Sequence, residues 1–151
     1  MNCDVIKLCY REMTKVRGEI EAAYGKNEWD IMGKCIEASD KLVKRLKSKG
    51  LDAQAYRVWA LYECFETCTS QCFEEHWIVL VRHKGKRIYL DPTYNQFQWA
   101  MNQKLPKVYI GTVLPNWLLP RKPSRKTLKK CGWTDFYNGR AYENEFNYYG
   151  S

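Results

Sequence analysis

Residues 76–91, HWIVLVRHKGKRIYLD, constrain the fold more than any other part of the chain. They form two runs of strand-favouring residues around Lys84 and Gly85, and glycine supplies the positive φ that a tight turn needs. The segment therefore predicts an antiparallel β-hairpin. Pairing across its turn sets His76 roughly opposite Asp91, with both side chains on one face of the sheet.

The residues before the hairpin predict two helices and a strand. Residues 3–24 repeat apolar side chains at steps of mostly three and four, and a glycine at 25 can end that helix. A second helical pattern covers 31–46 and ends in the basic, glycine-containing stretch 47–50. The period changes towards two over 51–62, and 108–113 predicts a further strand. We expect one α+β domain over 1–151, with N-terminal helices packed on an antiparallel sheet.

Composition excludes several classes of protein. The 151 residues are 45% hydrophobic and 28% charged, which is unlike a disordered, collagenous or low-complexity chain. No apolar stretch approaches the roughly 18 residues of a membrane span, and the first residues lack the pattern of a secretory signal. We therefore expect a soluble, cytoplasmic protein with no membrane partner.

The seven cysteines are an odd number, which fits reduced thiols better than a disulfide framework. Cys64, Cys68 and Cys72 have a spacing that would place three thiols on one face of a helix. Zinc ligands usually come as closer pairs with four ligands in total, so we interpret 64–72 as a connector with buried or redox-capable thiols. We expect neither a metal nor a cofactor.

The formal charge of +8 is concentrated in residues 121–130, which hold six basic side chains and no acidic one. A solvated surface segment is the simplest interpretation. With Trp117 before it and Trp133 after it, the segment could also bind nucleic acid or an acidic protein. Many aromatic side chains follow residue 130, and they predict a C-terminus that packs back onto the domain. The basic side chains are those of Arg121, Lys122, Arg125, Lys126, Lys129 and Lys130.

Three residues could form a thiol-based catalytic site. A thiol is a useful nucleophile when a helix N-terminus and an imidazole favour its thiolate, and when an acidic group orients the imidazole. Cys35 lies early on the second predicted helix, and His76 and Asp91 meet through the hairpin. Each residue also has an ordinary structural interpretation, because free cysteine is often part of a core and Asp before Pro often ends a strand. The combination favours catalysis.

Residues 30–97 resemble the core of the transglutaminase-like branch of the papain-like thiol enzymes. The resemblance rests on CIEASDKLVKRLKSKG, with its cysteine early on a helix, then a strand, then H-W-I-V-L-V and G-K-R-I-Y-L-D-P-T. It implies a papain-like or transglutaminase-like α+β fold. In this branch, which includes transglutaminases, peptidases, peptide N-glycanases and toxin-type glutamine deamidases, a cysteine attacks an amide carbonyl. By resemblance the nucleophile is Cys35, the proton carrier is His76 and the orienting acid is Asp91.

The resemblance implies acyl transfer from an amide through a Cys35 thioester. We expect deamidation or transamidation of a glutamine in a protein substrate, with peptide-bond hydrolysis as the alternative. The backbone N–H of Cys35 is the first candidate to stabilise the oxyanion, and the second is the Asn27 side chain or the Trp29 indole. Lys34 occupies a position that is often small or aromatic in the family; we interpret it as solvated, although it could also favour the thiolate.

Overall fold

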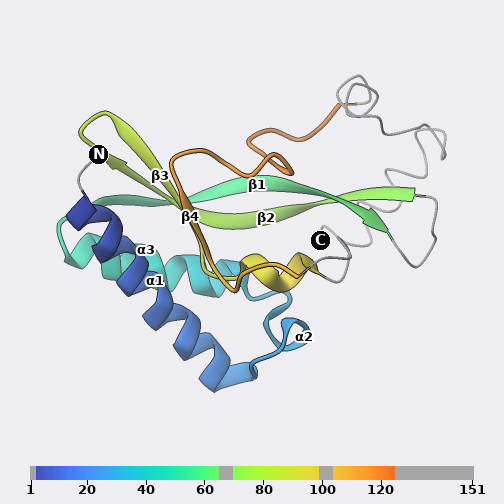
Figure 1. Ribbon diagram of the computed structural model, residues 1–151, viewed down its shortest axis with the longest axis horizontal. Coiled ribbons are helices and arrows are strands. Elements are labelled where there is room, and N and C mark those ends of the chain that lie inside the picture. The colour runs from blue at the N-terminus through green and yellow to red at the C-terminus, as the bar shows by residue number, and fades with distance from the viewer. Residues whose placement is uncertain (1–2, 65–69, 99–103, 125–151) are drawn as a thin grey trace.

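The computed structural model describes residues 3–64, 70–98 and 104–124. In this part of the chain, helices and a five-stranded sheet form the α+β arrangement that the sequence predicts (Figure 1). In chain order the elements are α1 (Cys3–Tyr24), α2 (Glu28–Ile31), α3 (Cys35–Ser48), β1 (Asp52–Cys64), β2 (Ser70–His83), β3 (Lys86–Asp91), the 3₁₀ helix η1 (Tyr94–Phe97), β4 (Tyr109–Gly111) and β5 (Leu118–Leu119).

The N-terminal helices follow the sequence pattern with one difference. α1 has the predicted bounds, but the second predicted helix is divided, since α2 ends at Ile31 and α3 begins at Cys35. Gly33, between the two, has a φ of 80°, which side chains with a Cβ rarely adopt and which interrupts the helix. Cys35 is therefore the first residue of α3.

The sheet is antiparallel, in the order β4-β3-β2-β1-β5. The predicted hairpin is confirmed as β2 and β3, and the predicted strand at 108–113 is confirmed in the shorter β4. Lys84 and Gly85 have φ values of 50° and 75°, and two successive positive φ angles match the right-handed twist of paired strands.

The long pairing of β1 with β2 changes the interpretation of the cysteine-rich segment. β1 ends at Cys64, which pairs with Ser70, and Cys72 lies within β2, opposite Tyr62. Cys68 lies outside the described residues. The connector predicted over 64–72 is thus shorter, because two of its three cysteines are already strand residues.

Hydrophobic side chains cover both faces of the sheet. Val79 and Val81 of β2 pack with α1 and α3, whereas Ile78 and Leu80 pack with η1 and β5. Successive strand residues point to opposite faces, so these two clusters lie on opposite sides of the same strand. A polar side chain in this part of β2 has little water to bond and needs partners within the protein.

Some expectations fall outside the described residues. These are the packing of the C-terminus beyond residue 130 and the positions of Arg125, Lys126, Lys129 and Lys130. Among the helices that the structure does describe, none has the length and apolar character needed to cross a membrane.

Candidate active site

The register of the hairpin brings His76 and Asp91 together. Val79 pairs with Leu90, so Asp91 lies level with Ile78 and projects to the same face as His76. His76 Nε2 lies 2.7 Å from Asp91 Oδ2. The side chains are 1% and 0% exposed, respectively. The pair is thus sealed from solvent.

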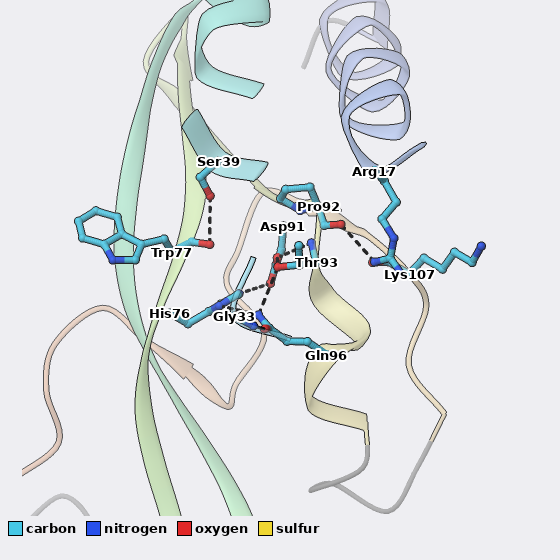
Figure 2. Close-up of polar contacts among 10 residues, drawn as sticks. All are labelled: Arg17, Gly33, Ser39, His76, Trp77, Asp91, Pro92, Thr93, Gln96 and Lys107. Atoms are coloured by element: carbon cyan, nitrogen blue, oxygen red, sulfur yellow. Dashed lines mark hydrogen bonds and ion pairs between the residues drawn. The ribbon is translucent and has the colours of Figure 1, made fainter. Parts of the chain in front are cut away.

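The turn after β3 fixes the orientation of the Asp91 carboxylate. While Oδ2 faces the imidazole, Oδ1 accepts hydrogen bonds from the Thr93 backbone N–H at 3.0 Å and from the Thr93 hydroxyl at 3.4 Å (Figure 2). An aspartate that accepts from the residue two positions later is a common way to shape a turn. Here both oxygens have defined donors, so the carboxylate cannot rotate without losing one of them.

Gln96, which the sequence analysis missed, completes the buried cluster. Its Nε2 lies 2.9 Å from His76 Nδ1 and donates to the Thr93 hydroxyl at 3.2 Å, while its Oε1 accepts from the Gly33 backbone N–H at 3.3 Å. The Gly33 N–H requires an acceptor, so it fixes which end of the amide faces the imidazole. The available sequence signal was the spacing of Thr93 and Gln96, which places both side chains on one side of a helical turn directly after Asp91.

Cys35 reaches this cluster from the start of α3. Its thiol lies close enough to the His76 ring to raise the pKa of the imidazole, and its side chain is partly exposed. Ser39, one helical turn further on, donates its hydroxyl to the Trp77 backbone carbonyl at 3.1 Å and ties α3 to β2 (Figure 2). The helix therefore holds the thiol beside β2, where the residue before Trp77 is His76.

The helix terminus itself adds a favourable field at the thiol. Lys34 is the N-cap residue, and a lysine side chain has no acceptor with which to cap the first turn. The first backbone bond of the helix runs from the Ala38 N–H to the Lys34 carbonyl, and the N–H groups before Ala38 lie at the positive end of α3. An anionic sulfur at Cys35 would be stabilised there.

The surroundings of His76 act on its charge in opposite directions. Burial lowers the pKa of His76, but the charge and hydrogen bond of Asp91, followed by those of Cys35, raise it to about 10. Gln96 opposes them, because its N–H group donates to Nδ1 and favours the neutral ring. The net effect is a raised pKa, so the ring is more basic than a free imidazole. Phe97 packs edge-on against the ring, with the centroids 4.8 Å apart.

The other candidate residues lie around this cluster rather than within its hydrogen bonds. Asn27 caps α2 through a reciprocal capping box with Asp30, and Trp29 on α2 is 59% exposed. Lys34 was interpreted as solvated, but its Nζ lies 4.1 Å from the centre of the Tyr24 ring, a cation–π contact. The roles of Asn27 and Trp29 as oxyanion donors stay predictions.

Only the beginning of the basic segment is described. Arg121 and Lys122 are exposed, and Lys122 Nζ lies 5.9 Å from the centre of the Trp59 ring. Within residues 3–64, 70–98 and 104–124, no group of three or more His, Cys, Asp or Glu side chains is arranged to hold a metal ion. Comparison of the chain with protein-family models, curated proteins and solved structures found no match.

Proposed function

We propose that the protein is a thiol enzyme that transfers the acyl group of an amide, with Cys35 as nucleophile, His76 as acid and base, and Asp91 as the orienting group. The observation that carries the proposal is the buried imidazole between two partners. Asp91 holds Nε2 at 2.7 Å, and the Cys35 thiol is a neighbour of the same ring. Because Asp91 occupies Nε2, proton exchange with the thiol goes through Nδ1, and the Gln96 amide that faces Nδ1 at 2.9 Å has to move aside when that proton is transferred.

The arrangement supports a two-step reaction. The thiolate of Cys35 attacks the amide carbonyl, and the resulting oxyanion is stabilised by the N–H groups at the start of α3. The imidazolium of His76 gives its proton to the leaving nitrogen, which departs as the C–N bond breaks, and a thioester remains. The neutral imidazole then takes a proton from the incoming water or amine, which displaces the Cys35 sulfur and regenerates the starting state.

The type of reaction depends on two groups: the amine that leaves the amide and the acceptor that takes the acyl group. When the amide belongs to a glutamine side chain, ammonia leaves; water as acceptor gives glutamate, and an amine gives an isopeptide bond. We propose protein glutamine deamidation or transamidation as the reaction. Peptide-bond hydrolysis uses the same three residues and is the alternative outcome, because groove shape and water access choose the substrate.

The test is incubation of the full chain with an unfolded, glutamine-rich protein, with and without a primary amine. Ammonia release and intact-protein mass spectrometry then separate deamidation, amine incorporation and chain cleavage. Cys35→Ala should lose all three, whereas Cys9→Ala, which removes a buried thiol of α1, should retain them. Equal activity of Cys35→Ala and wild type would contradict the proposal.

A further inference from the structure

Arg17 is a buried arginine in the middle of α1, 3% exposed. One nitrogen of its guanidinium, NH1, donates to two backbone carbonyls: that of Lys107 at 2.8 Å and that of Pro92 at 3.3 Å. Arginine is rarely buried so completely, since removing its charge from water is costly unless the protein provides acceptors and counter-charges. The buried guanidinium of Arg17 therefore serves to hold these two carbonyls.

Both carbonyls belong to the segments that flank Asp91. Pro92 follows Asp91 in the chain, and Lys107 lies two residues before Tyr109, which pairs with Asp91 across β3 and β4. Figure 2 shows Arg17 approaching the turn from the side opposite His76. A single side chain of α1 thus joins the two backbone segments between which Asp91 is held.

The charges around Arg17 are balanced from several elements. On α1, Glu21 Oε1 lies 3.7 Å from Arg17 Nε, and Lys107 Nζ donates to the same carboxylate at 2.9 Å. From β3 the charge of Asp91 also attracts the guanidinium. Beyond Asp91 lie the other titratable groups of the site, namely His76 on β2, Cys35 on α3, Tyr94 on η1 and Tyr109 on β4.

We propose that Arg17 is a positioning residue of the candidate site: by holding the Pro92 and Lys107 carbonyls it keeps Asp91 within hydrogen-bonding distance of His76. Without the guanidinium, two carbonyls lose a charged donor and the turn is free to relax. The Asp91 carboxylate then moves away from the ring. The inference rests on the proposed function only where it calls this cluster an active site. The effect of Arg17 on the Asp91–His76 contact can be measured without any substrate.

The sign of one measurement separates positioning from simple electrostatics. Removal of a positive charge near Asp91, with nothing moved, would raise the pKa of His76, because the imidazolium would lose a like-charged neighbour. Loss of the Asp91 contact lowers it instead. The chain has two histidines, so NMR titration of the ring nitrogens resolves His76, with His83 in the same strand as internal reference.

In wild type we expect His76 to stay protonated from pH 6 to 8.5, and in Arg17→Met we expect its pKa to fall by about 2, into this range. Arg17→Lys should give a smaller fall, because an ammonium keeps the charge but cannot hold two carbonyls as a rigid guanidinium does. An unchanged or higher pKa in Arg17→Met overturns the proposal. If Arg17→Met does not fold, the test is Arg17→Lys: a His76 pKa equal to that of wild type in this variant overturns the proposal.

Arg45→Met is the matched control. Arg45 on α3 pairs with Glu12 and Glu19 of α1, so its loss weakens the packing of α1 without touching the turn after β3. We expect Arg45→Met to lower the melting temperature and to leave the His76 titration unchanged. If it moves the titration as much as Arg17→Met does, the effect is general destabilisation and the proposal fails. The His76 titrations of wild type and the variants could follow these expectations while wild type shows no activity on amides. That outcome would contradict the proposed function and leave the positioning role of Arg17 intact.

Discussion

Two cysteines of this chain, Cys9 and Cys35, show how the surroundings of a thiol determine what it can do. Cys9 lies in α1 with no exposed surface, among the apolar side chains between α1, α3 and the sheet. Burial raises its pKa to about 11. Cys35 begins α3, is partly exposed and lies beside an imidazole whose pKa is raised to about 10. The first environment suppresses the thiolate, whereas the second places a thiol at a helix N-terminus beside an imidazole, although both residues belong to helices that pack together.

The comparison also separates two kinds of burial. Around Cys9 the buried side chains of the core cluster are apolar. Around His76 the protein buries an ion pair, a threonine hydroxyl and a glutamine amide, each with a hydrogen-bond partner. Such a polar cluster is weak evidence for stability, since apolar side chains of similar volume often serve as well. Its presence beside a partly exposed thiol favours a chemical role.

The largest effect is expected in thiol reactivity. With iodoacetamide at pH 7 we expect Cys35 to react at least about 1,000-fold faster than Cys9, because a thiol with a pKa near 11 is ionised in only about one molecule in 10⁴. Peptide mapping distinguishes the two from the other five cysteines. His76→Ala should remove most of the advantage of Cys35. Equal Cys35 rates in this variant and in wild type would show that His76 does not activate the thiol.

The next effect concerns the acid that orients the imidazole. Asp91→Asn keeps the shape of the side chain but removes the charge that raises the pKa of His76, and its amide can present a donor to Nε2. We expect a loss of about 100-fold or more in kcat on the amide substrate, with little change in KM. Thr93→Val is a milder comparison, since it removes one donor to Asp91 and keeps the backbone N–H. A KM change without a kcat change would assign Asp91 to substrate binding.

The sequence allowed much of this site to be predicted because its parts follow from local rules. The turn at Lys84 and Gly85 predicted the hairpin, and the hairpin predicted that His76 and Asp91 share one face of the sheet. Cys35 could be placed within the first turns of a helix from the apolar period, although its position as the first residue of α3 could not. The α+β class followed from the change of period at residue 51.

Other parts could not be predicted because they depend on contacts between distant segments. Gln96 bonds His76 and Gly33, which lie 20 and 63 positions away, and no local pattern encodes such partners. Arg17 looks like an ordinary charged residue of an amphipathic helix, yet its side chain is buried against Pro92 and Lys107. The break at Gly33 was missed because the apolar period continues through it.

The buried ion pair predicts how stability depends on pH. Because the pKa of His76 is raised from 6.5 to about 10, the folded protein binds one more proton than the unfolded chain between these values. The stabilisation is complete below pH 6.5 and is lost as pH rises towards 10, with a slope of about 1.4 kcal/mol per pH unit.

Denaturant unfolding at pH 6, 7 and 8 measures this slope. The comparison with Asp91→Asn isolates the contribution of the pair, since the variant retains every other titrating group. The range ends below the pH at which buried Cys9 would begin to contribute. We expect the stability of wild type to fall relative to the variant as pH rises. Parallel curves would show that Asp91 does not raise the pKa of His76.

The smallest effect is expected at Gln96, and its direction is opposite to that at Asp91. Gln96→Met keeps the volume of the side chain and removes the donor that favours a neutral Nδ1, so the pKa of His76 should rise slightly. The Gly33 N–H loses its acceptor, which loosens the segment before Cys35, and we expect kcat to fall by about 3- to 10-fold. NMR titration and steady-state kinetics measure the two quantities separately. A lower pKa of His76 in this variant would mean that Gln96 supports the imidazolium rather than opposing it.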